Sequence, residues 1–130
     1  MQPLEKLLQV MDRLLAPDGC PWDREQTHES LCKYLLEESH EAIEAINNSD
    51  MNALKDELGD VLLQVVFHAK IAEAASEFTI DDIINNLIAK LIRRHSHVFG
   101  DDKAQTAAEV LQIWENNKKK EKTVPNDCHL

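Results

Sequence analysis

Apolar residues recur at intervals of three and four along most of the chain, the spacing that places side chains on one face of an α-helix. No stretch alternates strictly between apolar and polar residues, as a half-buried strand would. The pattern therefore predicts an all-α fold. The predicted helices cover approximately residues 3–15, 27–46, 50–75, 79–98 and 106–120.

The residues between these helices are of the types that usually begin or end a helix. Thr27 and Asp50 are suitable N-caps for the second and third helices, and Thr106 with Glu109 forms a capping box for the fifth. Prolines and a glycine break the pattern after the first helix, so a loop is expected over residues 16–26. Only about four residues join the second and third helices, so these two helices should lie antiparallel.

The third helix carries apolar side chains that point in nearly all directions around its axis. A helix of this kind is buried on every side, and a chain of 130 residues has little other material to cover it. We therefore expect an antiparallel bundle of four to five helices, completed by oligomerisation as a homodimer or homotetramer. The alternative is that the first and fourth helices cover it within a monomer. One domain is expected over residues 1–122, followed by a polar tail over residues 123–130.

Four carboxylates occupy helix positions that are otherwise apolar. On the second helix, Glu38 lies inside the apolar arc and Glu41 lies at its edge. On the third helix, Glu57 and Asp60 lie between apolar neighbours, whereas Asp56 points in a polar direction. Each pair is spaced i, i+3 and so shares a helix face. Because the two helices are antiparallel neighbours, the pairs can face each other.

Acids in these positions need a counter-charge, because a buried carboxylate is costly unless it is protonated, paired or bound to a metal. Residues 25–60 contain ten acids and only two lysines, so a hard cation is the remaining solution. Oxygen ligands without thiolates favour Mg²⁺ or Mn²⁺ over Zn²⁺. Gly59 would allow a close backbone approach beside such a site. The alternative is that these acids form an ordinary solvated helix face.

Four sequence blocks resemble one known family. An EExxE motif at Glu37–Glu41 is followed, after fifteen residues, by an ExxD motif at Glu57–Asp60. The other blocks are Cys20–Thr27, Gly59–Phe67 and Arg93–Phe99. Together, and in this order, they resemble the MazG-type nucleoside triphosphate pyrophosphohydrolases over residues 1 to about 122. The chain resembles the N-terminal domain of the two-domain members.

This resemblance implies Mg²⁺-dependent hydrolysis of a nucleoside triphosphate between its α and β phosphates, with Mn²⁺ as the alternative metal. The products would be a nucleoside monophosphate and pyrophosphate, in a house-cleaning role for the nucleotide pool. Glu38, Glu41, Glu57 and Asp60 match the metal-ligand positions of the family. Glu37 is the candidate to orient or deprotonate the attacking water, and an exposed, non-catalytic role is its alternative.

Basic and aromatic residues supply candidates for the rest of a nucleotide site. Arg94 lies within the apolar arc of the fourth helix and Lys90 on its border, and both match the basic motif of the family. We expect them to hold phosphates, although they could instead complement the helix dipole. Trp22 and Trp114 are candidates to stack on a base, with structural anchoring as the alternative.

The composition limits the partners. With 24 acidic and 14 basic residues the net charge is −10, which disfavours a nucleic-acid polymer but not a small anion that arrives with a divalent cation. Three isolated glycines cannot form a Walker or Rossmann phosphate loop. No apolar run approaches a membrane span, and no secretory signal is evident. Three widely spaced cysteines indicate neither disulfides nor a metal knuckle, so a cytoplasmic location is expected.

Two functions of other classes are compatible with the same residues. Glu37 and His40 form one of the two Glu-x-x-His elements that a di-iron carboxylate bundle needs, but Glu57-x-x-Asp60 is not a second. A non-enzymatic alternative is a dimeric regulatory module that binds nucleotide or metal with little or no cleavage.

Overall fold

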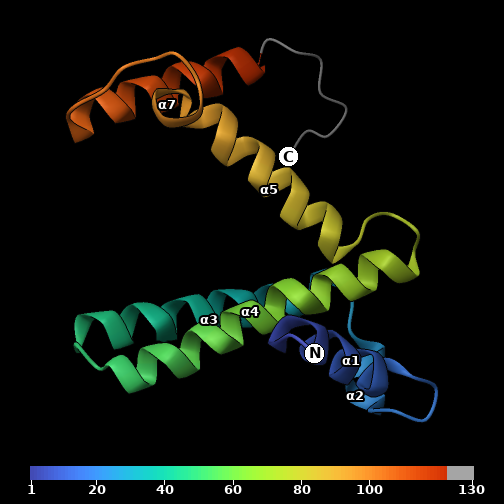
Figure 1. Cartoon of the computed structure of the whole chain (residues 1–130). Helices are drawn as coiled ribbons and strands as arrows, with labels where there is room; N and C mark the ends of the chain where they lie inside the picture. Colours follow the sequence, from blue (N-terminus) through green and yellow to red (C-terminus); the bar gives the residue numbers. More distant parts are fainter. Residues whose placement is uncertain (123–130) are drawn as a thin grey trace. The chain divides into compact units, whose positions relative to one another are not determined.

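The computed structural model describes residues 1–122 and consists of α-helices, with no β-strand among these residues (Figure 1). The predicted all-α class is confirmed. The helices are α1 (Pro3–Leu15), α2 (Pro21–Glu25), α3 (His28–Asn47), α4 (Met51–Ala74), α5 (Ile80–Arg94), α6 (Ser96–Phe99) and α7 (Ala107–Lys122). Within this part of the chain, no helix combines the length and apolar character that a bilayer span requires. The predicted tail, residues 123–130, lies outside the described residues.

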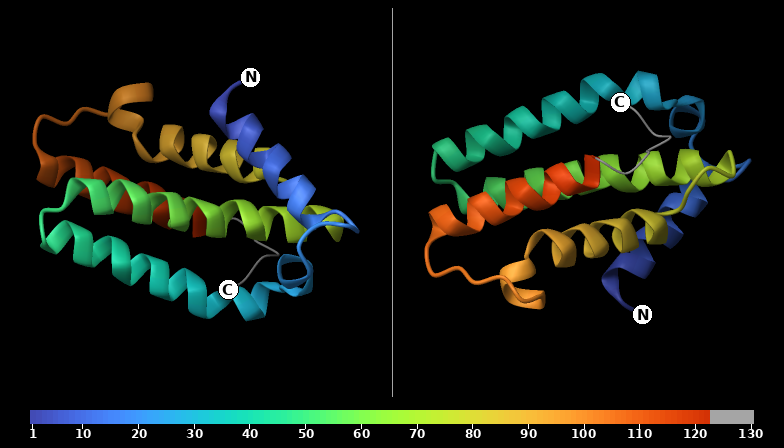
Figure 2. Two further views of the ribbon diagram at one scale, coloured as in Figure 1. Left: turned by 90° about the horizontal axis from the view of Figure 1, so that it is seen from below. Right: turned by 90° about the horizontal axis from the view of Figure 1, so that it is seen from above.

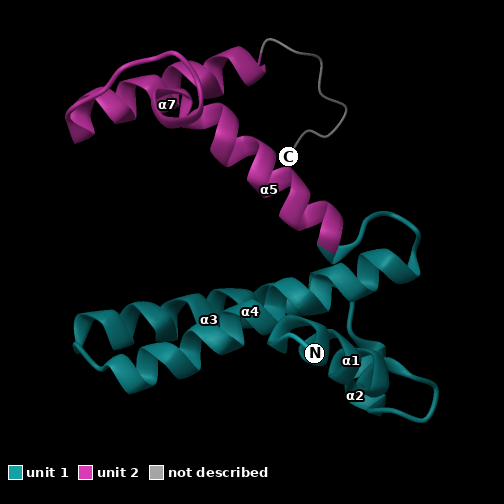
Figure 3. Cartoon of the chain, in the orientation of Figure 1, with its two compact units in different colours: residues 1–80 teal, residues 81–130 magenta. Residues whose placement is uncertain are grey.

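The helices fall into two compact units, residues 1–80 and residues 81 onward (Figure 3). The first unit contains α1 to α4. In it, α3 and α4 lie side by side and run antiparallel, and α1 packs against α4 (Figures 1 and 2). The antiparallel pair predicted from the short connection is therefore confirmed.

The core of the first unit lies where α1, α3 and α4 meet. Met11 of α1, Leu31 of α3, and Val66 and Phe67 of α4 are almost fully buried. Partly buried apolar side chains surround them: Leu7, Leu8, Leu14, Leu15, Tyr34, Leu63, Ile71 and Ile80. Removal of this apolar surface from water stabilises the unit and fixes which faces α3 and α4 turn toward each other.

The N-caps of α3 and α4 form at the predicted residues. The Ser30 amide donates to Thr27 Oγ1 at 3.0 Å, and the Thr27 amide donates to Ser30 Oγ at 2.8 Å, which makes a reciprocal capping box. The Ala53 amide donates to Asp50 Oδ1 at 3.0 Å. These bonds satisfy amides that have no acceptor within their own helix, so both helices start at defined residues.

The loop predicted over residues 16–26 is wrong for residues 21–25, which form α2. Pro21 lies in the first turn, where a proline sacrifices no helical hydrogen bond. The preceding turn is tight, because a Cβ on Gly19 would lie 2.1 Å from the Leu14 carbonyl oxygen. A tight turn therefore joins α1 to α2, and α2 occupies residues that were expected to form a loop.

The single helix predicted over residues 79–98 is interrupted at His95, which separates α5 from α6. The backbone of His95 is not helical, with φ −108° and ψ 50°. The next residue is held by tertiary bonds: the Ser96 hydroxyl donates to Asp102 Oδ2 at 2.6 Å and accepts from Asn117 Nδ2 at 2.8 Å. These contacts with distant residues override the helical pattern.

The last helix, α7, starts at the predicted cap but continues beyond its predicted end. The Glu109 amide donates to Thr106 Oγ1 at 3.2 Å. The Glu109 carboxylate accepts from the Gln105 amide at 3.4 Å, one residue away from a standard capping box. The helix reaches Lys122, two residues beyond the approximate predicted end, and the Glu121 carboxylate is held by two arginines of α5.

The longest helix, α4, carries an exposed apolar face as well as a buried one. Leu58, Leu62 and Val65 follow one another at four- and three-residue intervals and are 52%, 46% and 37% exposed. On α3, further large apolar side chains are exposed: Leu35, Leu36, Ile43 and Ile46. Apolar side chains at this density on two neighbouring helices support the oligomer expected from the sequence, which stays a proposal.

We predict that the protein is a dimer or tetramer at micromolar concentration and that Leu58→Glu or Leu62→Glu reduces it to monomers. A charged side chain on an apolar interface must lose its hydration without gaining a partner. Light scattering after size exclusion measures the mass. The matched control is Lys55→Glu, an exposed position on the same helix. A wild-type protein that is monomeric at this concentration would sink the prediction.

Candidate metal centre

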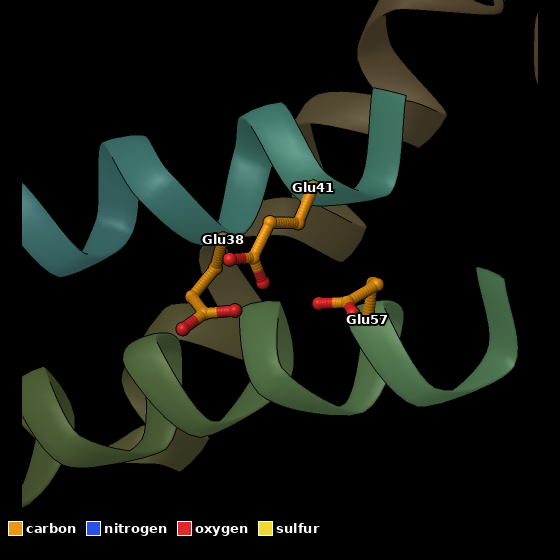
Figure 4. Close-up of side chains that lie close together, drawn as sticks. All are labelled: Glu38, Glu41 and Glu57. Carbon is orange, nitrogen blue, oxygen red and sulfur yellow. The ribbon is translucent and has the colours of Figure 1, made fainter. Parts of the chain in front are cut away.

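Three glutamates converge between α3 and α4 (Figure 4). Glu38 and Glu41 project from α3 toward α4, and Glu57 projects from α4 toward them. One carboxylate oxygen of each residue lies within 4.8 Å of one from both others. The short connection between the helices causes this arrangement, because it brings the start of α4 opposite the end of α3. The prediction that the acidic pairs face each other is confirmed for these three side chains.

Asp60 belongs to a second group, which shares Glu57 with the first. One oxygen each from Asp56, Glu57 and Asp60 lies within 4.8 Å of the others. Asp56 is exposed, as its polar direction predicts, and yet its carboxylate joins this group. The sequence contained a signal for it, because Asp56 precedes Asp60 by four residues, which is one helical turn. The two groups are therefore adjacent, with Glu57 common to both.

The acids differ in burial. Glu38, Glu57 and Asp60 are half-buried, whereas Glu41 is exposed. The expectation that apolar residues surround Glu41 is wrong. Glu41 instead borders an open hollow of about 350 Å³, which Glu57 and residues of the α3–α4 connection also line. This hollow gives a ligand from solution access to both glutamates.

Two oxygens of the cluster are buried without a hydrogen-bond partner among the residues that the structure describes: Glu38 Oε2 and Glu57 Oε2. Burial raises the pKa of Glu38, and the like charges of Glu41 and Asp60 raise it further. The pKa of Glu57 is raised to about 7, first because its carboxyl group can share a proton with Glu41, then through burial and the charges of Glu41 and Asp60. Both glutamates therefore resist ionisation unless a positive charge is brought to them.

The arrangement fits a hard divalent cation. Both groups consist of carboxylates alone, and oxygen donors of this kind favour Mg²⁺ or Mn²⁺. A cation would also supply the partner that the two buried oxygens lack. A Cβ on Gly59 would have no neighbour within 4 Å among the described residues, so no contact within this part of the chain requires the glycine, and its role beside a metal site stays a prediction.

Glu37, the predicted catalytic residue, is exposed on α3 and belongs to neither group. Its role in positioning water stays a prediction. His40 is also exposed and outside both groups. The single Glu-x-x-His element therefore does not join the convergent carboxylates, and nothing in this arrangement favours a di-iron site.

Trp22 borders a second hollow, a mostly apolar pocket of about 240 Å³ enclosed by residues of α1 to α4. Glu38 lines this pocket as well as joining the carboxylate cluster. Trp22 as a residue is 49% exposed, and its ring meets Tyr34 edge to face, with centroids 5.7 Å apart and planes inclined by 75°. Trp22 is thus anchored and also available to a ligand, and its role in base stacking stays a prediction.

Lys90 and Arg94 lie on α5, in the second unit. Lys90 is half-buried. Arg94 donates to Glu121 through two nitrogens, Nη2 at 2.9 Å and Nε at 3.2 Å, and its guanidinium carbon lies 5.3 Å from the centre of the Trp114 ring. Hydrogen bonds from Arg94 and Arg93 lower the pKa of Glu121 to about 2. Trp114 therefore has a structural partner, and the phosphate-binding roles of Lys90 and Arg94 stay predictions.

Comparison with known proteins finds close relatives. The sequence profile of the MazG nucleotide pyrophosphohydrolase domain matches residues 26–99, a span that contains the five predicted acids, Lys90 and Arg94, but not Trp22. The crystal structure of a mazG-related protein from Thermotoga maritima superposes with a TM-score of 0.72. That match has 29% sequence identity and covers 88% of this chain and 98% of that chain.

Three curated relatives are named as nucleoside triphosphate pyrophosphohydrolases. The chain is 53% identical over 118 residues to the nucleoside triphosphate pyrophosphohydrolase/pyrophosphatase MazG of Thermotoga maritima, covering 91% of this chain and 45% of the relative. For the Escherichia coli K12 protein the identity is 45% over 123 residues, covering 94% and 47%. For the Mycobacterium tuberculosis protein it is 43% over 125 residues, covering 92% and 38%. The chain thus spans less than half the length of these relatives.

The raised pKa of Glu57 predicts a pH-dependent stability in the absence of divalent cations. The pKa is about 7 in the folded state and 4.5 in the reference state, so the folded protein binds more protons between these values. Stability from this group is fully present below pH 4.5 and is lost as the pH rises through about 7. Thermal melting in EDTA at pH 5 and pH 8 should show a drop that Glu57→Gln reduces. An equal drop in melting temperature in the wild type and in Glu57→Gln would show that Glu57 does not cause the pH dependence.

Replacing a predicted ligand should weaken metal binding without loss of helix. We expect Glu41→Ala and Asp60→Ala each to lower the Mg²⁺ affinity measured by calorimetry, because each removes a carboxylate from the cluster. Helix content by circular dichroism should stay intact, since removal of one charge relieves repulsion among the others. Glu29→Ala, an exposed position on α3, is the control. Unchanged Mg²⁺ affinity in both test variants would show that these residues are not ligands.

Proposed function

The chain belongs to the MazG nucleotide pyrophosphohydrolase family, and from this premise we propose that it hydrolyses nucleoside triphosphates between the α and β phosphates. The products are a nucleoside monophosphate and pyrophosphate, and the role is removal of unwanted nucleotides from the pool. The observation that carries the proposal is the convergence of Glu38, Glu41 and Glu57, with two buried oxygens that no donor reaches. The names of the curated relatives support the same reaction.

The metal in this proposal is Mg²⁺, with Mn²⁺ as a substitute. Glu38, Glu41, Glu57 and Asp60 would hold it, and Asp56 lies close enough to contribute. When bound, a divalent cation supplies positive charge against phosphate oxygens that become more negative during the reaction. The acidic cluster needs such a charge, since a polyanionic substrate cannot approach carboxylates that are ionised and unpaired.

The chemical step is attack by water on the α phosphorus. A bond forms between the water oxygen and phosphorus, and the bond from phosphorus to the bridging oxygen of the β phosphate breaks. Pyrophosphate leaves with the electron pair of that bond. In this scheme Glu37, exposed at the turn that also carries Glu38, accepts the proton that the water loses. The exposed position suits a group that must return its proton to solvent after each cycle.

Substrate binding in this proposal uses the basic candidates, Lys90 and Arg94, and the aromatic candidate, Trp22. Lys90 and Arg94 contact the phosphates in this proposal, and the planar guanidinium of Arg94 suits a phosphate as well as it suits Glu121. Trp22 contacts the base from the pocket that Glu38 also lines. The shared residue Glu38 makes this pocket the natural place for the nucleoside end of a nucleotide whose phosphates lie at the carboxylates. The protein would act as a homo-oligomer.

A panel of ribo- and deoxyribonucleoside triphosphates with Mg²⁺ tests the reaction directly. Pyrophosphate and orthophosphate are measured separately, together with the nucleotide product. The proposal expects pyrophosphate and monophosphate in equal amounts and no turnover in EDTA. Release of orthophosphate would place cleavage at another bond. Binding without turnover of any nucleotide would favour the regulatory-module alternative.

We predict that Arg94→Ala lowers kcat/KM by about one to two orders of magnitude, because a hydrogen bond to a charged group is worth about 1.5–3 kcal/mol. The loss should be equal for every base, since phosphates are common to all substrates. Trp22→Ala should instead change the preference among bases more than the maximal rate. Arg13→Ala, an exposed arginine on α1, is the control. A base-dependent loss in Arg94→Ala would move Arg94 from the phosphates to the base.

A further inference from the structure

The pocket beside Glu38 contains a buried amide that the proposed reaction does not use. Gln64, on α4, is 6% exposed and lines this pocket. Its Oε1 atom has no hydrogen-bond partner among the described residues. Such an atom is uncommon in a folded protein, because it has lost its contact with water and gained no donor in return. A bound molecule with a donor group can supply that partner.

The rest of the pocket suits a flat ring with polar edges. Leu31 and Phe67 are among its apolar walls, and Trp22 and Tyr34 contribute aromatic rings. Aromatic side chains bind the faces of nucleobases by stacking. A glutamine amide carries a donor and an acceptor next to each other, the arrangement that pairs with the edge of a base. The pocket therefore combines a surface for the face of a base with a group for its edge.

The position of Gln64 relative to the acids agrees with a nucleotide. Gln64 follows Asp60 by four residues on α4, so it lies one turn further along the same face. Glu38 contributes both to the pocket and to the carboxylate cluster. If the phosphates of a nucleotide lie at the carboxylates, its base would therefore lie near the amide of Gln64.

We propose that Gln64 hydrogen-bonds the edge of the nucleobase and determines which bases the enzyme accepts. This inference rests on the proposed function. The amide accepts a hydrogen bond from an exocyclic amino group, as in adenine and cytosine. Rotated by half a turn about the Cγ–Cδ bond, it donates to an exocyclic oxygen, as in hypoxanthine and uracil. Glutamine thus tolerates both classes of base at the exocyclic atom, whereas an ionised carboxylate, which has acceptors alone, favours an amino group over an oxygen at that atom.

The test compares kcat/KM for substrates that differ only at this edge, dATP with dITP and dCTP with dUTP. In Gln64→Glu, assayed at a pH high enough to ionise the new carboxylate, the ratio of amino to oxo substrate should rise about tenfold in each pair, the effect of one hydrogen bond replaced by repulsion. The ratio cancels any effect of the new carboxylate on metal or phosphates. In Gln64→Met, which has a similar volume, kcat/KM should fall about tenfold for all four substrates because the bond is lost.

Three controls separate base recognition from other causes. Gln9→Met, at an exposed position of α1, should leave all values unchanged. Thermal melting should show that both Gln64 variants fold. Inhibition by tripolyphosphate with Mg²⁺ should be equal in wild type and Gln64→Met, because this inhibitor has no base.

The outcomes distinguish the two proposals. A wild-type protein that releases no pyrophosphate from any substrate overturns the proposed function. An active wild type with unchanged substrate ratios in Gln64→Glu overturns the role of Gln64 alone. A loss of tripolyphosphate binding in Gln64→Met, equal to the loss for nucleotides, also overturns it, since the residue would then only support the structure. If Gln64→Glu does not fold, Gln64→Met provides the test. The role of Gln64 is then supported only if Gln64→Met weakens kcat/KM for nucleotides but not inhibition by tripolyphosphate.

Discussion

Repulsion between like charges is the constraint on which the candidate site depends. Glu38 and Glu41 on α3 face Glu57 on α4, with oxygens within 4.8 Å of one another. Two helices with this charge would separate if nothing else held them. The raised pKa values of Glu38 and Glu57 express the same conflict, because each group lowers its energy by taking up a proton. A divalent cation offsets the repulsion without protonation. The fold therefore holds these carboxylates where a bound cation lowers their energy.

Contacts at both ends of the α3–α4 pair hold the acids together. At one end, Asp50 caps α4 directly after the connection. At the other, His28 and His68 join the helices: their Nδ1 atoms lie 2.7 Å apart, so that one donates to the other, and their rings are parallel. Burial, and secondarily His28, lowers the pKa of His68, so this contact persists in the neutral state and is lost as the pH falls through that lowered pKa. The carboxylates respond in the opposite direction, since acid relieves their repulsion. At near-neutral pH, the contact between His28 and His68 is intact and the carboxylates can bind a cation.

Periodicity and caps were sufficient to predict most of the helices and the convergence of Glu38 and Glu41 with Glu57, because those features are set by helix positions and a short connection. Thr27 and Asp50 cap the helices that they were expected to cap. One error has a different cause. The break at His95 is accompanied by a bond between residues more than twenty positions apart, Asn117 with Ser96. Gln64 lies within the block Gly59–Phe67, but that block gives it no role, and only the assembled pocket reveals that its Oε1 is buried without a partner among the described residues.

The contact between Arg94 and Glu121 bears on how a phosphate could be held. An ion pair of this kind can block an arginine, but among the described residues Glu121 accepts from only two of the three guanidinium nitrogens. A guanidinium has five N–H donors, and Glu121 accepts from Nε and from Nη2. The remaining donors can bind a second anion while Glu121 and the Trp114 ring hold the plane of the group in place. An arginine fixed in this way loses little side-chain entropy on binding, so, if Arg94 holds a phosphate as proposed, the carboxylate would position it rather than compete for it.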